Sequence, residues 1–121
     1  MTDNQAIERA KEVLKIEADS ILGLIGRIDD SFASAVDIIY RSKGRVIITG
    51  IGKSGLIGKK IAATLTSTGT QAMFLHPVEG IHGDLGIVTK EDVIIAISNS
   101  GETSELNLIV NAIRSIGTQI I

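Results

Sequence analysis

The sequence has no cysteine and only three aromatic residues, Phe32, Tyr40 and Phe74. The lack of cysteine excludes disulfides and thiolate metal sites. Because aromatics are so scarce, any core has to be built from Ile, Leu, Val and Ala, as in buried parallel sheets covered by helices. The 121 residues suffice for one domain and leave no room for two.

The sequence also lacks a basic run, a leader and a long apolar segment. The net charge is −2, and the few aromatics offer no stacking surface, so we expect no nucleic-acid partner. The start, from Met1 to Gln5, has no basic region followed by an apolar stretch, as a signal peptide would. The apolar runs are strand-sized, far below the roughly 18 residues of a membrane span. We therefore expect a cytoplasmic protein without a membrane partner.

The first third of the sequence reads as helical. Apolar residues recur at spacings of three and four over 5–28, which predicts one long helix whose narrow stripe packs on its own domain or on a partner chain. A second helix is expected over 31–43, with Asp30 or Ser31 as its cap and Gly44 as its stop. These elements form an N-terminal helical segment, 1–44. The stripe of the first helix consists of Ile7, Ala10, Leu14, Ile21, Leu24 and Ile28.

From residue 45 on, the pattern changes to strands alternating with helices. Apolar, largely β-branched runs at 45–49, 71–75, 92–97 and 118–121 predict strands, with helices over 56–67 and 104–116 and a loop over 76–89. This alternation predicts an α/β fold, a three-layer α/β/α sandwich with a flavodoxin-like parallel sheet. Because the chain stops inside a strand, we expect 45–121 to be a domain truncated at its C-terminal side.

A glycine-rich turn follows the first strand. Its residues 50–55, Gly-Ile-Gly-Lys-Ser-Gly, match the spacing of a dinucleotide fingerprint, which also needs an acidic residue where 75–77 read Leu-His-Pro. A nucleotide phosphate loop would need glycine in place of Ile47. More generally, Lys53 supplies a cation and Ser54 a hydroxyl at a helix start, as an anion site requires. The alternative is a tight turn in which Ser54 caps the helix and Lys53 is solvated.

A polar turn follows the third strand, at 98–103. Ser98, Asn99, Ser100 and Thr103 place three hydroxyls and an amide around a helix N-terminus, where free N–H groups and the helix dipole favour an anion. The alternative is a capping device, but one residue would suffice for that. In a flavodoxin-like sheet the winding direction reverses between the first and third strands, so we expect the two turns to converge on one phosphate site.

These motifs carry a family resemblance. The stretch 93–105 (VIIAISNSGETSE) resembles the signature of the sugar-isomerase (SIS) domain, in which this loop holds a sugar phosphate. The turn 50–55, the stretch 62–70 (AATLTSTGT) and the stretch 76–86 (HPVEGIHGDLG) are similar to those of the arabinose-5-phosphate isomerases. The resemblance runs from about Ile7 to the end of the chain.

The resemblance implies an aldose–ketose isomerase that interconverts D-arabinose 5-phosphate and D-ribulose 5-phosphate for lipopolysaccharide precursor synthesis. It also implies a small-molecule sugar phosphate as partner and a homo-oligomer, a tetramer in the family. A further glutamate and histidine of the family, and its CBS pair, have no counterpart up to Ile121. The positions matching catalytic residues are Lys53 and Glu105, and those matching substrate-binding residues are Ser54, Gly69, Thr70, His82, Ser98, Asn99, Ser100 and Thr103.

Two histidines, His76 and His82, flank Glu79 in the predicted loop, and Asp84 follows. Imidazole and carboxylate can bind zinc, but this spacing matches no standard template, and both histidines could simply form hydrogen bonds that shape the loop. The resemblance makes His76 a candidate zinc contact. Because moving a proton needs no metal, we expect no required cofactor and a zinc ion that inhibits.

Two other functions remain open on sequence grounds. A non-catalytic phosphosugar sensor would carry the same anion loop but would not need Lys53 or His82. An oxidoreductase would use the glycine-rich turn for a dinucleotide, and stabilisation by NAD would distinguish it.

Overall fold

The computed structural model describes residues 3–121. Helix α1 (Asp3–Gly23) and the 3₁₀ turn η1 (Ile25–Arg27) precede helix α2 (Asp30–Arg41). The rest of the chain alternates strands and helices: β1 (Val46–Gly50), α3 (Lys53–Ser67), β2 (Ala72–Phe74), α4 (Pro77–Ile81), η2 (Asp84–Ile87), β3 (Val93–Ile97), α5 (Ser104–Ile116) and β4 (Gln119–Ile120).

The four strands form one parallel sheet in the order β2-β1-β3-β4. Strand β1 lies in the middle, with Val46 opposite Ala72 of β2 and Val93 of β3. This order is the flavodoxin-like order with the reversal between β1 and β3. The predicted α/β class and parallel sheet are therefore confirmed.

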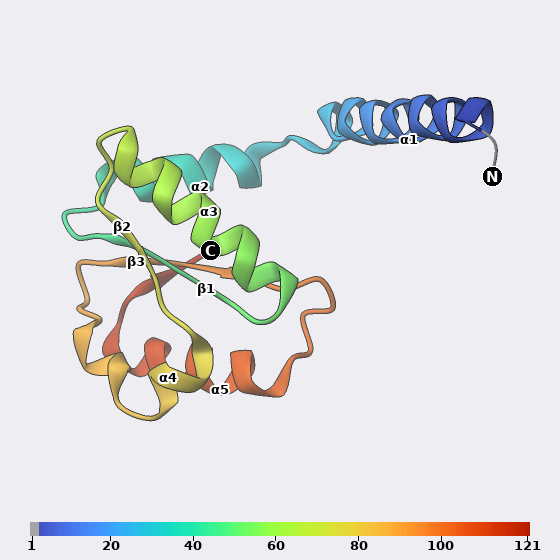
Figure 1. Cartoon of the computed structure of the whole chain (residues 1–121). Coiled ribbons are helices and arrows are strands. Elements are labelled where there is room, and N and C mark those ends of the chain that lie inside the picture. Colours follow the sequence, from blue (N-terminus) through green and yellow to red (C-terminus); the bar gives the residue numbers. More distant parts are fainter. Residues whose placement is uncertain (1–2) are drawn as a thin grey trace. The chain divides into compact units, whose positions relative to one another are not determined.

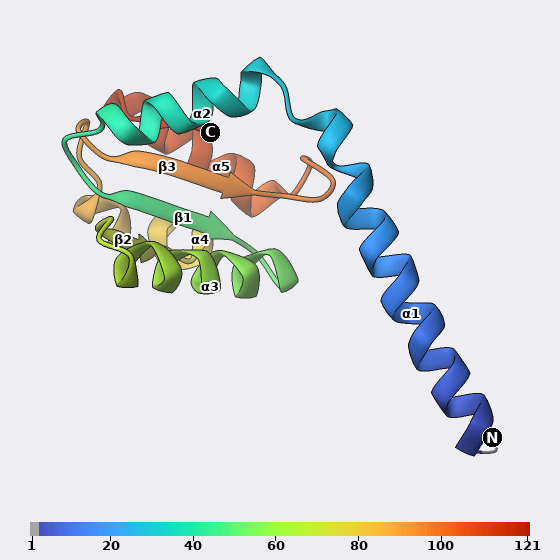
Figure 2. The same ribbon diagram turned by 90° about the horizontal axis from the view of Figure 1, so that it is seen from above.

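Helices cover both faces of the sheet, so the predicted three layers are also confirmed (Figures 1 and 2). On one face Val46 and Ile48 pack with Ala62 of α3, and Ile39 of α2 packs against them. The hydrophobic core on the other face is larger and joins β1 and β3 to α5, α4 and the segment that follows α4. Its buried residues are Ile47, Leu75, Val88, Ile94, Leu106, Ile109 and Ile113. Alternate residues of β1 serve opposite faces, as the two-residue period of a strand requires.

Three sequence expectations about local structure are wrong. The first helix ends at Gly23 instead of running to residue 28, and glycine is a poor helix former. The segment 76–89 contains α4 and η2 instead of a plain loop, because Pro77 suits a first helical position and His76 caps it. Helix α2 is capped by Asp29, whose Oδ1 accepts the Ser31 N–H at 2.9 Å, and not by Asp30 or Ser31.

An ion pair between the half-buried Arg45 and the buried Asp92 lies at the amino-terminal ends of β1 and β3. Asp92 is 2% exposed and accepts hydrogen bonds from the backbone N–H groups of Arg45 (2.7 Å) and Thr89 (2.9 Å). The Arg45 guanidinium bonds Asp92 Oδ2 at 3.2 Å and the Ile87 carbonyl at 2.6 Å. Burial raises the pKa of Asp92, but hydrogen bonds from Arg45 and Thr89 and the Arg45 charge hold it below 3.8, its ordinary value. One carboxylate thus joins the starts of β1 and β3 to the end of the α4–η2 segment.

The chain divides into two compact units, one up to Ser34 and one from Ala35 to Ile121. The predicted boundary between residues 44 and 45 stays a prediction. In the first unit, α1 exposes much of its predicted stripe, with Leu14 and Ile21 each 66% exposed. No helix in residues 3–121 is long and apolar enough to cross a membrane.

Candidate functional site

The carboxyl-terminal edge of the sheet brings the two predicted turns together. Gly50, the last residue of β1, is paired with Ile97, the last residue of β3. The chain then enters α3 on one face of the sheet and α5 on the other, as the two core clusters show. The N-termini of both helices therefore lie at the switch point, which is where open parallel sheets bind ligands.

The first turn depends on its glycines. Gly52 lies at φ 62°, in a region that disfavours side chains, and a Cβ on Gly55 would approach the Gly50 carbonyl oxygen to 2.7 Å. This close approach seats the start of α3 directly on the end of β1. Lys53 is exposed and Ser54 half-buried in the first turn of the helix. Within the described chain, no side chain caps α3 at Gly52, so the Ser54 cap considered from the sequence is not formed.

The second turn is shaped by its serines. The Ser98 hydroxyl accepts the Gly101 N–H at 2.8 Å, and the Ser100 hydroxyl accepts the Glu102 N–H at 3.2 Å. Both hydroxyls act there as acceptors, so each keeps its own hydrogen to donate to a ligand. Thr103 is the N-cap residue of α5 but makes no side-chain capping bond to any described residue. The N-terminus of α5 therefore keeps the free N–H groups that suit a phosphate.

The two candidate catalytic residues, Lys53 and Glu105, each lie in the first turn of a helix that starts at this edge. Lys53 is the first residue of α3, and Glu105 is the second residue of α5. Both side chains are exposed, and Glu105 accepts a hydrogen bond from the Ser104 hydroxyl at 3.1 Å. The edge thus combines a cation, a carboxylate and a group of hydroxyls, which is the set that a proton-transfer enzyme for an anionic substrate needs.

Gly69 and Thr70 lie at the opposite edge of the sheet. They connect the end of α3 to the start of β2 and line a hollow of about 430 Å³ beside Val36, Ile39 and Tyr40. A five-residue strand is roughly 16 Å long, which is more than one pentose phosphate can reach across. Within one copy of the chain, these two residues are therefore not part of the site formed by the two turns.

The two histidines flank helix α4. His76 is its N-cap residue and His82 its C-cap residue. The His76 ring meets the edge of the Phe74 ring, with centroids 6.4 Å apart. Gly80 packs closely on Ile109, which fixes α4 against the middle of α5. No three His, Cys, Asp or Glu side chains within residues 3–121 gather where they could hold a metal ion.

Two features had no counterpart in the sequence reasoning. The Thr49 hydroxyl is fully buried at the end of β1 and has no hydrogen-bond partner among the described residues. The only hint of this in the sequence is a polar residue within an apolar strand.

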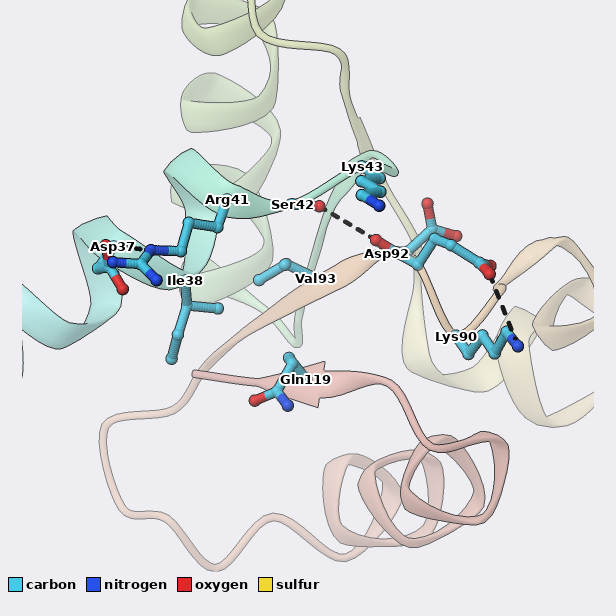
Figure 3. Close-up of a pocket in the computed structure, with 10 residues that line it drawn as sticks. Asp37, Ile38, Arg41, Ser42, Lys43, Lys90, Asp92, Val93 and Gln119 are labelled. Carbon is cyan, nitrogen blue, oxygen red and sulfur yellow. Dashed lines mark hydrogen bonds and ion pairs between the residues drawn. The ribbon is translucent and has the colours of Figure 1, made fainter.

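The second feature is a hollow of about 380 Å³ at the amino-terminal ends of the strands, shown in Figure 3. Asp37 pairs there with Arg41 at 2.8 Å, and Lys90 pairs with Glu91 at 3.9 Å. None of the predicted site residues lines this second hollow.

A family model for the SIS domain matches residues 38–121. The chain belongs to the SIS-domain family. Both polar turns of the carboxyl-terminal edge fall within the matched residues, so the two-turn site is a feature of this SIS domain.

Two curated relatives carry the same name. The chain is 50% identical over 118 residues to the arabinose 5-phosphate isomerase KdsD of Francisella tularensis, covering 95% of this chain and 36% of that protein. It is 46% identical over 115 residues to the KdsD of Pseudomonas aeruginosa, covering 95% of this chain and 35% of that protein. The chain thus spans about a third of the length of these relatives.

A solved structure supports the fold assignment. A protein of Escherichia coli CFT073, solved in complex with arabinose 5-phosphate, superposes with a TM-score of 0.93 at 38% identity, covering 99% of this chain and 64% of that one. At this level of similarity the SIS domain described above and that protein share one architecture.

Proposed function

We propose that this SIS domain belongs to an aldose–ketose isomerase that interconverts D-arabinose 5-phosphate and D-ribulose 5-phosphate for lipopolysaccharide precursor synthesis. One observation carries the proposal. The N-termini of α3 and α5 lie together at the carboxyl-terminal ends of β1 and β3, no described side chain caps either of them, and Lys53 stands at the start of α3. The relatives named arabinose 5-phosphate isomerase, and the related structure solved with that sugar phosphate, support this choice of substrate.

The proposed chemistry moves one proton between C2 and C1 of the sugar, and one between the oxygens on these two carbons, through an enediol. The 98–103 turn binds the phosphate, with the Ser98 and Ser100 hydroxyls and the free N–H groups of α5 as donors. Ser54, Asn99 and Thr103 add contacts around it. A phosphate anchored here orients the sugar, which removes most of the entropic cost of the proton transfer.

Lys53 and Glu105 have the reacting end of the sugar as their proposed target. The Lys53 ammonium stabilises the negative charge that develops on the carbonyl oxygen, and Glu105 moves the proton or orients the group that does. Their separate helices approach the edge from opposite faces of the sheet, which favours contact with opposite sides of one bound sugar.

We also propose that the protein works as a homo-oligomer in the cytoplasm. If Gly69 and Thr70 contact the substrate, they do so from a second copy, because in one copy they lie at the far edge of the sheet. The exposed stripe of α1 offers apolar surface for that association, and it includes the strongly exposed Leu14 and Ile21. A tetramer is the assembly that the family resemblance favours.

Zinc is the one metal that the resemblance suggests, with His76 as its contact. A zinc site needs three or four protein ligands, and the described residues offer no such cluster. These residues alone therefore do not fit a zinc site, and no step of the proposed reaction uses a metal. We propose an inhibitory zinc ion at His76 only together with further ligands from outside the described residues of one copy.

Ligand binding to this chain tests the proposed site. We expect arabinose 5-phosphate to raise the melting temperature and to shift the amide resonances of residues 98–103 in a dose-dependent way, whereas arabinose and NAD leave both unchanged. Ser100→Ala should weaken binding several-fold, because one phosphate donor is lost. Lys90→Ala removes an exposed cation at the other edge and serves as the matched control. Stabilisation by NAD alone would contradict the proposal and favour a dinucleotide site.

Turnover separates an isomerase from a phosphosugar sensor. The assay uses the longest natural polypeptide that contains this sequence. It measures the ribulose 5-phosphate formed from arabinose 5-phosphate. Lys53→Ala should lower kcat by at least about 100-fold while binding weakens far less, because the charge it stabilises develops only in the transition state. Full turnover by Lys53→Ala would remove the role given to Lys53, and binding without turnover in the parent protein would favour the sensor.

A further inference from the structure

Phe74, the last residue of β2, is one of three aromatic residues in the chain, and its ring packs against the start of α3. Two glycines of that helix leave room for it. A Cβ on Gly55 would lie 3.3 Å from Cζ of the ring, and a Cβ on Gly58 would lie 3.2 Å from Cε2. Both distances are tighter than most Cβ contacts, so the ring fills a notch that exists because these two residues have no side chain.

The same ring has two further neighbours. The Lys59 ammonium lies over the ring, 5.3 Å from its centroid, within the range of a cation–π interaction. The His76 ring meets it edge-on, with the centroids 6.4 Å apart and the planes at 72°. Phe74 therefore connects α3, the helix that begins with Lys53, to the residue that leads into α4.

The start of α3 depends on such packing because the chain before it is permissive. The link to β1 runs through Gly50 and Gly52, and Gly52 at φ 62° has no side chain to restrain it. Lys53 is exposed, and no ion pair within residues 3–121 anchors its ammonium. The place of this ammonium therefore follows the backbone of the first helical turn, and the Phe74 ring touches that turn at Gly55.

We propose that Phe74 is a positioning residue of the isomerase: its ring holds the first two turns of α3, and through them Lys53, at the reacting end of the sugar. The inference rests on the proposed function and adds a residue that does not itself touch the substrate. A shift of about 1 Å in a catalytic group can lower a rate by about 100-fold. Phosphate binding is assigned to the turn before α5, on the other face of the sheet, so loss of the ring should affect turnover more than binding.

Steady-state kinetics of Phe74→Leu test the proposal. This variant keeps an apolar side chain but leaves much of the notch empty. In the longest natural polypeptide that contains this sequence, kcat for arabinose 5-phosphate should fall by about tenfold, while KM changes by less than about threefold. Leu65→Ala is the matched control, because Leu65 packs on the same core cluster near the other end of α3. It should lower the melting temperature and leave kcat unchanged.

A double-mutant cycle separates positioning from a general loss of structure. If Phe74 acts through Lys53, then Phe74→Leu should lower kcat by less than about twofold once Lys53 is replaced by alanine. Equal fold-losses in the two backgrounds, or an unchanged kcat in both, would overturn the inference. Should Phe74→Leu fail to fold, Phe74→Tyr takes its place in the cycle. Its added hydroxyl on Cζ would press on Gly55 and displace the same turn.

The orientation of α3 gives a second readout that needs no turnover. Residual dipolar couplings of the N–H bonds are insensitive to the lost ring current, and in Phe74→Leu they should change over residues 53–58 but not over 98–103. Unchanged couplings over 53–58 would overturn the inference. A parent polypeptide that binds arabinose 5-phosphate without turning it over would contradict the proposed function instead, and the couplings would still decide whether the ring holds α3 in place.

Discussion

Replacing Asp92 by alanine would remove the carboxylate that joins β1, β3 and the end of the α4–η2 segment. The N–H groups of Arg45 and Thr89 would lose their acceptor, and the guanidinium would lose its counter-ion. Removing one partner of a buried ion pair typically costs about 3–5 kcal/mol. The Arg45 side chain is 35% exposed, so water can solvate it in part. We therefore expect a loss of about 3 kcal/mol in the free energy of unfolding.

Urea denaturation followed by circular dichroism measures this loss. With a slope of about 2 kcal/mol per molar urea, the midpoint should fall by about 1.5 M. Asp37→Asn serves as the control, because it breaks an exposed ion pair in which the Arg41 side chain is 77% and the Asp37 side chain 55% exposed. It should lower the free energy of unfolding by no more than about 0.5 kcal/mol. A loss below about 1 kcal/mol for Asp92→Ala would refute the reasoning.

The same ion pair predicts a pH dependence. The folded-state pKa of Asp92 lies below its ordinary value of 3.8, so its stabilisation is complete above that value and is lost as the pH falls through the folded pKa. The difference in unfolding free energy between the parent chain and Asp92→Asn should be constant from about pH 7 to about pH 5 and shrink below about pH 4. A difference independent of pH down to acid unfolding would show that the charge of Asp92 contributes nothing.

Further predictions concern Thr49, Gly55 and α1. Thr49→Val should raise the unfolding free energy by about 1 kcal/mol, because it removes a buried hydroxyl without a described partner, and a decrease would reveal a bound water. Gly55→Ala should cost about 1–3 kcal/mol in urea unfolding because its Cβ meets the Gly50 carbonyl, whereas Gly23→Ala, with nothing within 4 Å, should cost nothing. Leu14→Glu should lower the mass seen in sedimentation if α1 forms the subunit interface, while Leu108→Glu, 60% exposed on α5, should not.

The sequence by itself determined the fold class and the two turns, after β1 and β3, that form the candidate site. Apolar strands alternating with amphipathic helices can bury their surfaces only in a layered parallel sheet, so the order and most bounds of the elements follow from local patterns. The turns after β1 and β3 converge because the carboxyl ends of neighbouring parallel strands meet at one edge. Local patterns were insufficient where two signals compete, as at Gly23, which ends a helix that the apolar stripe continues.

Only the tertiary structure decided which distant residues meet. The family resemblance makes Gly69 and Thr70 candidate substrate contacts, but within one copy the return of α3 along β1 carries them to the amino-terminal ends of the strands. Arg45 and Asp92 are 47 positions apart, and their pairing depends on β1 lying beside β3. Such contacts result from chain packing in three dimensions, which a one-dimensional period of apolar residues does not encode.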